Sequence, residues 1–153
     1  LIGVSFGLLD FVEKHKMTLK NTIVMETGGM KGRRKEMTRD ELHKKLSKGF
    51  GVKKIHSEYG MTELLSQAYS KGDGIFELPS TMKFFIRDPE DPLTIFDDFD
   101  KTGGINVIDL CNINSCSFIA TQDLGQKTND NTLKILGRFD HSDIRGCNLL
   151  TLN

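Results

Sequence analysis

The sequence lacks an excess of charge of either sign. Its 153 residues include 21 basic and 21 acidic side chains, which gives a formal net charge of zero. A nucleic-acid-binding protein usually carries a basic excess or a basic stripe. The one basic cluster, at residues 31–35, is short and is followed at once by Glu36, a pattern typical of a solvated loop. We therefore expect no nucleic-acid partner.

Long apolar runs and paired cysteines are also missing. No apolar run reaches the ~20 residues that cross a bilayer, so we expect no membrane span. The three cysteines, Cys111, Cys116 and Cys147, are an odd number without the short paired spacing of a zinc site. A reduced, cytoplasmic protein is the simplest interpretation. Each cysteine by itself is more typical of a small buried apolar side chain than of a nucleophile.

An initiator methionine is missing, because the chain begins at Leu1 inside an apolar stretch. A natural start rarely opens on a buried strand, and we therefore interpret the sequence as a fragment of a longer protein. Its 153 residues suffice for one compact domain with its own core.

The first part of the chain alternates strand and helix signals. Short apolar runs at residues 1–6 and 22–25 predict strands, and residues 8–15 carry the apolar spacing of a helix. Because a strand, a helix and a strand follow one another at short spacing, we expect a parallel β-α-β unit.

A second helix and a third strand follow. Thr38 and Glu41 have the spacing of a capping box, which predicts the start of a helix, and Gly49 predicts its end. Residues 52–57 then predict a strand that leads into a loop.

The pattern changes after about residue 70. The acidic segment 88–100 contains two prolines and predicts a loop. Four short β-like runs follow, at residues 105–110, 117–120, 133–136 and 149–152. Asn129-Asp130-Asn131, between two of these runs, is a hairpin-turn signal. We therefore predict an α/β fold in which a parallel β-α-β portion, residues 1–70, is followed by a small antiparallel β-barrel-like portion, residues 71–153.

Two candidate loops follow predicted parallel strands, which is where open α/β sheets bind ligands. The Gly28-Gly29 pair permits positive φ angles and close backbone approach to a ligand, although a plain turn is the simpler interpretation. The run Tyr59-Gly60-Met61-Thr62-Glu63 combines a ring that can stack on a base, a hydroxyl that can donate to phosphate, and a carboxylate that can hold Mg²⁺. The same run is equally typical of a loop that enters a helix with Thr62 as its cap.

Three further positions stand in the β-rich part. Asp123, in the run Thr121-Gln122-Asp123, either caps a glycine turn or accepts hydrogen bonds from ribose hydroxyls. Arg138, in the run Gly137-Arg138-Phe139-Asp140, either pairs with nearby acids or contacts a nucleotide. Cys147 follows an arginine and a glycine, and a neighbouring cation favours the thiolate form of a cysteine.

The order of these motifs resembles that of the adenylate-forming superfamily, which includes acyl-CoA synthetases, firefly-type luciferases and peptide-synthetase adenylation domains. Tyr59-Gly60-Met61-Thr62-Glu63 resembles its Tyr-Gly-x-Thr-Glu signature, and Gly28-Gly29 its Gly-Gly-Ala segment. Thr121-Gln122-Asp123 resembles its Thr-Gly-Asp segment. Gly137-Arg138-Phe139-Asp140 resembles its Gly-Arg-x-Asp hinge, with Ile144-Arg145-Gly146 in place of Ile-Lys-x-x-Gly. The large domain of these enzymes likewise runs from an α/β portion into a β-barrel portion.

Within the superfamily, residues 56–64 and 145–149 resemble most the acyl-protein synthetases of bacterial bioluminescence. Those enzymes activate a fatty acid with ATP as acyl-AMP and then move the acyl group onto their own cysteine near the carboxyl terminus. The resemblance thus implies a cytoplasmic ligase that uses ATP and Mg²⁺ and binds a fatty acid and ATP or AMP. It also implies acyltransferase or reductase partner proteins.

The resemblance implies a role for each motif. The implied nucleotide-binding positions are Gly28, Gly29, Tyr59, Gly60, Met61, Asp123 and Arg138. Tyr59 would pack on the adenine, and Asp123 and Arg138 would fix the ribose. The implied catalytic positions are Thr62, Glu63 and Cys147. Thr62 would contact the α-phosphate, Glu63 would hold Mg²⁺, and Cys147 would receive the acyl group.

The sequence also departs from the superfamily. No Ser/Thr/Gly-rich phosphate loop precedes Gly28, the lysine of the usual mobile domain is absent, and Gln122 replaces the usual glycine. We therefore expect this chain by itself to be inactive. Two alternatives stay open. One is a non-catalytic, acyl-ligase-like subunit that docks or carries an acyl group, and the other is a coenzyme A ligase that forms its thioester on free coenzyme A.

Overall fold

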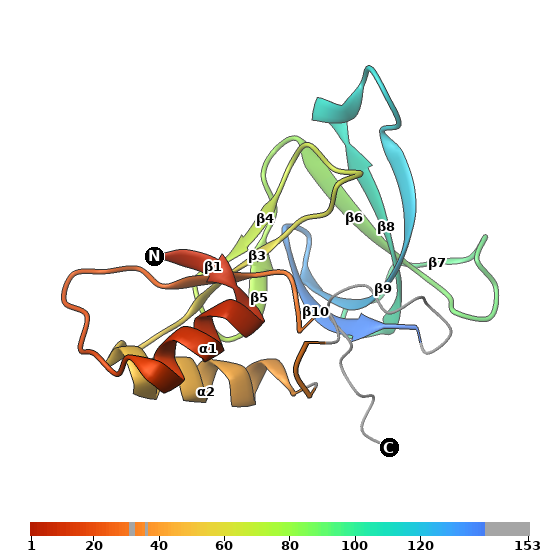
Figure 1. Cartoon of the computed structure of the whole chain (residues 1–153). Coiled ribbons are helices and arrows are strands. Elements are labelled where there is room, and N and C mark those ends of the chain that lie inside the picture. The colour runs from red at the N-terminus through yellow and green to blue at the C-terminus, as the bar shows by residue number, and fades with distance from the viewer. Residues whose placement is uncertain (31–32, 36, 140–153) are drawn as a thin grey trace.

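The computed structural model describes residues 1–30, 33–35 and 37–139 (Figure 1). Two α-helices, one 3₁₀ helix and ten strands follow one another there. The helices are α1 (Ser5–Lys14), α2 (Arg39–Phe50) and η1 (Leu110–Asn112). The strands are β1 (Ile2–Val4), β2 (Met25–Thr27), β3 (His56–Tyr59), β4 (Ala68–Ser70), β5 (Ile75–Glu77), β6 (Met82–Arg87), β7 (Ile95–Phe96), β8 (Thr102–Asp109), β9 (Phe118–Asn129) and β10 (Thr132–Arg138).

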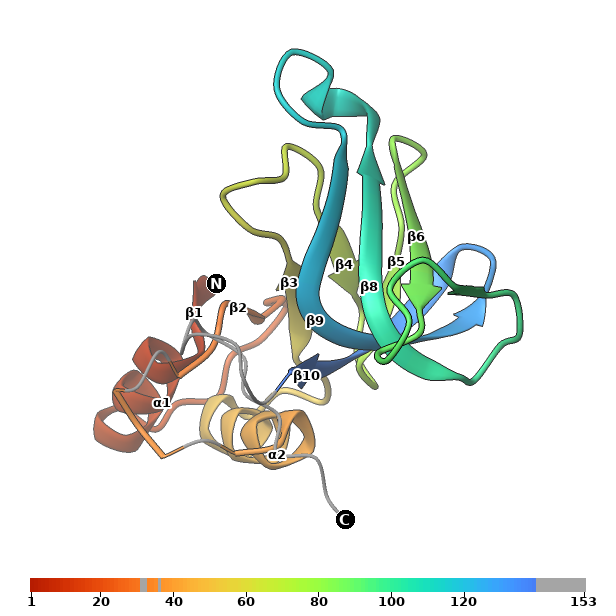
Figure 2. The ribbon, with the colours of Figure 1, turned by 90° about the vertical axis from the view of Figure 1, so that its right-hand side faces the viewer.

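All ten of these strands belong to one sheet, in the order β1-β2-β3-β4-β5-β10-β9-β8-β6-β7. The pairs β1–β2 and β2–β3 are parallel, and every later pair is antiparallel. The predicted α/β fold, parallel first and antiparallel afterwards, is therefore confirmed. The antiparallel portion curves strongly but is not closed into a barrel, because β1 and β7 stay at opposite ends of the strand order (Figure 2).

The two helices pack side by side next to the parallel strands (Figures 1 and 2). They cover one of two apolar cores, which consists of Leu8, Leu9, Val12, Val24, Met30, Leu42, Leu46, Phe50 and Ile55. The second core lies inside the antiparallel portion and consists of Tyr59, Leu64, Ala68, Phe76, Met82, Phe84, Ile86, Ile105, Val107, Leu133 and Ile135. The boundary that the sequence suggests at residue 70 stays a prediction.

Helix α2 begins as the sequence predicts but ends later. The hydroxyl of Thr38 accepts from the backbone N–H of Glu41 at 3.3 Å, and the Glu41 carboxylate accepts from the Thr38 N–H at 3.1 Å, which completes the capping box. The helix does not stop at Gly49 but at Gly51, whose φ of 65° ends it in the left-handed region. Gly49 serves a different purpose, because a methyl group there would overlap the side chain of Val12 on α1.

Strand β9 is longer than the sequence suggests. Its 12 residues include Asp123, which the sequence places at a turn, and Tyr59 likewise lies in β3 instead of the following loop. Strand pairing on both sides explains the difference, since β9 pairs with β8 and with β10 and these contacts override the turn preference of the Gln-Asp-Leu-Gly run. The predicted hairpin at residues 129–131 is confirmed by the β9–β10 pairing.

The segment 88–100 is not a loop throughout, as predicted, because it contains β7, which pairs with β6. Two further short strands, β4 and β5, are also absent from the sequence-based prediction. They link the two portions of the sheet, because β4 pairs with β3 and β5 pairs with β10. The predicted strand at residues 149–152 lies outside the described residues. Among the described helices, none has the length and apolar character that a bilayer crossing requires.

Candidate functional site

Tyr59 and Asp123 meet at the junction between the two portions of the sheet. The Tyr59 hydroxyl donates to Oδ2 of Asp123 at 2.6 Å, in a bond that is buried from solvent. Tyr59 is the last residue of β3, and Asp123 lies in the middle of β9. The Thr121 hydroxyl accepts from the Asp123 N–H at 3.1 Å, so the Asp123 backbone is held as well as its side chain.

The electrostatic setting of Asp123 opposes its charge. Burial raises the pKa of the Asp123 carboxyl above its ordinary value, and the negative charge of Glu63 raises it further. The Tyr59 hydrogen bond and the positive charge of Arg138 act in the other direction and partly offset the increase. A carboxylate in such a position gains from any ligand that brings hydroxyl donors to it.

Arg138 is directed at Asp123 by an irregularity in β10. The pairing of β10 with β9 shifts register between Ile135 and Gly137, and the φ of Gly137 is 150°. A bulge of this kind re-aims the side chains that follow it. Arg138 then pairs with Asp123 across the strands, with Nε 3.7 Å from Oδ1, and it donates to Oε1 of Gln122 at 3.0 Å.

The Gly28-Gly29 turn lies beside the end of β3. Strands β2 and β3 are parallel and in register, with Thr27 opposite Glu58, so the residues that follow them emerge at the same sheet edge. The Thr27 hydroxyl donates to Oε1 of Glu58 at 3.0 Å and links the two strand ends. Gly28 has a φ of 67°, which favours glycine at this turn. The turn and the Tyr59 loop therefore start side by side.

The ring of Tyr59 is part of the second apolar core. It meets Phe76 edge-on at 6.2 Å between ring centroids and Phe84 at 5.8 Å. Only 9% of the residue is exposed. The packing of the ring thus determines the position of the hydroxyl, and little of the residue is exposed to solvent.

The loop after Tyr59 carries the remaining predicted positions. Gly60, Thr62 and Glu63 are exposed, whereas Met61 is partly buried and packs against the second core. The Leu64 N–H donates to the Met61 carbonyl at 3.0 Å, which closes a tight turn with Thr62 and Glu63 at its tip. The Glu63 carboxylate is close enough to the Tyr59–Asp123 cluster for its charge to raise the pKa of Asp123.

A magnesium ion at this place would be held by Glu63 together with groups that are not part of this chain. In the described part of the chain, no group of three His, Cys, Asp or Glu side chains has the spacing of a metal site. Mg²⁺ is commonly bound by one or two carboxylates together with waters and substrate phosphates. The exposed carboxylate of Glu63 provides one such ligand.

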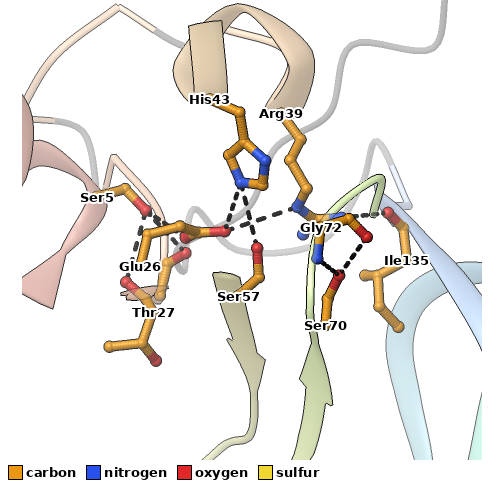
Figure 3. A network of polar contacts seen from close by, with 10 residues as sticks. Ser5, Glu26, Thr27, Arg39, His43, Ser57, Ser70, Gly72 and Ile135 are labelled. Atoms are coloured by element: carbon orange, nitrogen blue, oxygen red, sulfur yellow. Dashed lines mark hydrogen bonds and ion pairs between the residues drawn. The ribbon is translucent and has the colours of Figure 1, made fainter. Parts of the chain in front are cut away.

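A buried polar network that the sequence did not reveal lies behind the Gly28 turn (Figure 3). Its centre is Glu26 on β2, which is 3% exposed. Ser5 at the start of α1 donates to Oε2 of Glu26 at 2.9 Å, and Nε2 of His43 lies 3.4 Å from Oε1. Nε of Arg39 lies 3.7 Å from the same oxygen. The signal available in the sequence was an acid at the end of an apolar run, separated from two glycines by a single threonine.

The charge of Glu26 is retained despite its burial. Burial by itself would raise the pKa of Glu26, but the hydrogen bond from His43, the charge of Arg39 and the serine hydroxyls outweigh it and hold the pKa below its ordinary value. The Ser5 hydroxyl also lies 3.3 Å from the Gly28 carbonyl. The network therefore supports the turn that stands at the candidate site.

The same network does not have the geometry of a nucleophilic triad. The hydroxyl of Ser57 lies 3.2 Å from Nε2 of His43, the same nitrogen that contacts Glu26. A triad needs the acid and the nucleophile on opposite ring nitrogens. Ser57 is also completely buried. Its role here is structural.

Arg39 connects the network to the antiparallel portion. Nη1 of Arg39 donates to the Ile135 carbonyl at 2.9 Å (Figure 3). The guanidinium also lies 5.0 Å from the centroid of the Phe76 ring. Ile135 directly precedes the bulge that aims Arg138. Arg39 therefore links the support of the Gly28 turn to the strand that carries Arg138.

The cysteines divide into two groups. Cys111 and Cys116 are free and exposed at the far end of the β8–β9 hairpin. Cys147, the predicted acyl acceptor, lies outside the described residues, as do Asp140 and the run Ile144-Arg145-Gly146. The structure thus brings together Gly28, Tyr59, Glu63, Asp123 and Arg138 of the predicted positions.

The fold is similar to that of several solved proteins, although no family model and no curated protein matches the sequence. O-succinylbenzoate coenzyme A synthetase from Bacillus subtilis, in complex with ATP and magnesium ion, matches with a TM-score of 0.60 and 20% identity. A mutant form of coronafacic acid ligase from Pectobacterium brasiliense matches with a TM-score of 0.60 and 16% identity. Apo MatB from Rhodopseudomonas palustris matches with a TM-score of 0.53 and 16% identity.

Each of these likenesses covers most of this chain and a minor part of the other. The share of this chain is 90% in all three, whereas the shares of the synthetase, the ligase and MatB are 31%, 29% and 34%. At identities of this size, the structural match establishes a similarity of fold. The chain therefore has the fold of about a third of each of these three proteins.

Proposed function

We propose that the full-length protein activates a carboxylic acid, a fatty acid in the preferred case, with ATP as acyl-AMP and transfers the acyl group to Cys147. The support is the likeness in fold to acid-activating ligases together with one observation. Tyr59 meets Asp123, 64 positions away, in a 2.6 Å hydrogen bond, and Arg138 on the adjacent strand adds a 3.7 Å ion pair to the same carboxylate. This cluster is the adenosine site of the proposal.

In the first step, an oxygen of the substrate carboxylate attacks the α-phosphorus of ATP. The bond between the α-phosphorus and the bridging oxygen breaks, and pyrophosphate leaves with the bonding electrons. Asp123 accepts hydrogen bonds from the ribose hydroxyls, and Arg138 holds the Asp123 carboxylate in place. Thr62 would donate to the α-phosphate, and Glu63 would hold Mg²⁺, which would supply positive charge against the negative charge that develops. Most of this catalysis is positioning and charge stabilisation.

In the second step, the thiolate of Cys147 attacks the acyl carbonyl carbon. The bond between that carbon and the phosphate oxygen breaks, and AMP leaves as the thioester forms. A thiolate is the reactive form of cysteine, and Arg145 two residues earlier would favour it. Acyltransferase or reductase partners would then receive the acyl group from this thioester.

The test is ATP–pyrophosphate exchange by the full-length protein in the presence of fatty acids of graded chain length. Exchange that depends on the acid supports acyl-AMP formation, and Asp123→Ala should abolish it. Absence of exchange with every acid overturns the proposal and favours a non-catalytic subunit that docks or carries an acyl group.

A coenzyme A ligase is the second candidate, favoured by the likeness to O-succinylbenzoate coenzyme A synthetase. It shares the first step and differs in the thiol that accepts the acyl group. Formation of acyl-coenzyme A at an undiminished rate by Cys147→Ser would select this candidate. Loss of all thioester formation in the same variant would select transfer to the protein.

A further inference from the structure

Asp109, at the end of β8, is a completely buried carboxylate that lies outside the nucleotide cluster. Its Oδ2 accepts from the backbone N–H groups of Leu65 at 2.7 Å and Ser66 at 2.9 Å. Its Oδ1 accepts from the Ser66 hydroxyl at 2.7 Å and from the Cys111 N–H at 3.0 Å. Four donors therefore converge on one side chain, and three of them come from the segment directly after Glu63.

These donors explain why Asp109 is charged inside the protein. Burial by itself would raise the pKa of Asp109, but the hydrogen bonds from Ser66, Leu65 and Cys111 outweigh it and hold the pKa below its ordinary value. An ionised carboxylate with this many donors binds its partners more strongly than a neutral acceptor does. The attachment of residues 65 and 66 to β8 is therefore rigid.

Asn112 holds the other side of Glu63. Its Nδ2 donates to the main-chain carbonyl of Glu63 at 2.6 Å and to the carbonyl of Cys116 at 2.9 Å. Asn112 is 6% exposed and lies in η1, at the tip of the β8–β9 hairpin. The amide thus joins the hairpin tip to the residue whose side chain carries the proposed magnesium ligand.

The two sets of contacts together restrain the backbone that carries the Glu63 side chain. The carbonyl of Glu63 is held by Asn112, and the N–H groups two and three residues later are held by Asp109. The peptide planes that follow the Glu63 Cα are therefore restrained, while the side chain itself stays exposed. Neither Asp109 nor Asn112 is exposed enough to act as a ligand itself.

We propose that Asp109 and Asn112 are positioning residues. They hold Glu63 in the orientation in which it binds the divalent cation of a nucleoside triphosphate. This inference rests on the proposed function, because it takes Glu63 as a Mg²⁺ ligand. According to this inference, the β8–β9 hairpin tip contributes to the site through the contact of Asn112 with Glu63.

The experiment measures nucleotide binding by the full-length protein at a series of Mg²⁺ concentrations. Asn112→Ala removes both amide donors, and Asn129→Ala, in the exposed turn of the β9–β10 hairpin, is the matched control. We expect Asn112→Ala to raise the Mg²⁺ concentration that half-saturates ATP binding about ten-fold, the scale of one lost hydrogen bond. Affinity for AMP without Mg²⁺ should change less than about two-fold, because AMP binding does not use Glu63.

Ser66→Ala serves as a milder second variant. It removes the hydroxyl that donates to Asp109 and leaves the backbone donors in place, so it should shift the Mg²⁺ dependence in the same direction by a smaller factor. Unchanged Mg²⁺ dependence in both variants overturns the inference, and so does an equal loss of AMP and ATP affinity, which indicates general loosening of the site. If the unaltered protein binds neither nucleotide, the proposed function fails and this inference fails with it.

Discussion

The Tyr59 hydroxyl and the Asp123 carboxylate form a 2.6 Å hydrogen bond across 64 positions of the sequence. The ring of Tyr59 is held by edge contacts with Phe76 and Phe84, so the donor cannot follow the carboxylate if the latter moves. Arg138 restrains the other oxygen of the same carboxylate. Asp123 is thus oriented before any ligand arrives, which lowers the entropic cost of binding one.

Tyr59→Phe should weaken nucleotide binding in a pH-dependent manner. The substitution keeps the packed ring but removes a donor that lowers the Asp123 pKa, so that pKa should rise further. Nucleotide affinity should fall about ten-fold, the scale of a hydrogen bond to a charged group. The loss should grow as the pH is lowered, because more of the Asp123 carboxyl is then protonated. Calorimetric titrations with AMP between pH 5 and 8 measure both effects.

Tyr69→Phe is the matched control for this prediction. Tyr69 lies in the neighbouring strand β4 and is 42% exposed. Its substitution should leave the affinity for AMP and its pH profile unchanged. Equal profiles for Tyr59→Phe and the unaltered protein would contradict the role of the hydroxyl.

Asp123→Asn should stabilise the fold while it weakens nucleotide binding. The folded-state pKa of Asp123 is raised above the ordinary value, so the folded state favours the protonated form and loses stability as the pH rises through that pKa. A neutral asparagine removes this loss, and we expect a gain on the order of 1 kcal/mol at pH 7. The gain should vanish at about pH 2.5, well below the ordinary Asp pKa of about 3.9, because the carboxyl is then protonated in both states. Urea unfolding at the two pH values provides the measurement.

Glu26→Gln should destabilise the protein, most strongly at neutral pH. The folded-state pKa of Glu26 is held below its ordinary value of 4.5, so its stabilising effect is present above that pH and is lost as the pH falls through the folded-state pKa. Breaking a buried ion pair costs about 3 kcal/mol. In chemical unfolding at a series of pH values from 7 to 3, the difference in the free energy of unfolding between Glu26→Gln and the unaltered protein should decrease as the pH falls.

A surface ion pair provides the comparison for Glu26. Lys71 and Glu77 lie 2.8 Å apart with both side chains more than half exposed. Glu77→Gln should change the free energy of unfolding by less than about 1 kcal/mol. A similar effect for the two substitutions would show that burial adds nothing to the Glu26 network.

Gly49→Ala should destabilise the packing of α1 against α2. Alanine improves helix propensity by about 1 kcal/mol, but the new methyl group overlaps the Val12 side chain and forces the helices apart. Overpacking of this kind costs about 1–3 kcal/mol. We therefore expect a lower thermal midpoint. The control Lys48→Ala, at an exposed position of the same helix, should change it little. An unchanged midpoint for Gly49→Ala would refute the close contact.

Cys147→Ser tests the acyl acceptor of the proposed function. The variant should form acyl-AMP, detected as ATP–pyrophosphate exchange at a rate within about two-fold of the unaltered protein, because serine keeps the size of the side chain. Labelling of the protein by radioactive fatty acid should disappear, since a serine hydroxyl is a far weaker nucleophile than a thiolate. Cys116→Ser, at an exposed free cysteine, should retain the label. Label that persists in Cys147→Ser would assign the acyl group to a different residue.

Several features could be predicted from short stretches of sequence because their causes are local. The capping box of Thr38 and Glu41 depends on two hydrogen bonds within four residues, and it forms as predicted. The turn at residues 129–131 closes the predicted hairpin through a contact two positions apart. Gly49 shows the limit of such reasoning. Glycine often ends a helix, but Gly49 lies inside α2 and allows α1 to approach closely.

The residues themselves determined the order of the motifs and the spacing of a tyrosine, an acid and an arginine. They also determined the start of the helix and the hairpin, because backbone torsions and neighbouring side chains specify these local features. Only the tertiary structure decided which of these residues meet. Asp123 became part of a strand, and Arg39 reached the Ile135 carbonyl across 96 positions, through pairing between distant segments. Burial raises the pKa of both Glu26 and Asp123, but the net shifts are opposite, since partner groups outweigh desolvation at Glu26 and not at Asp123.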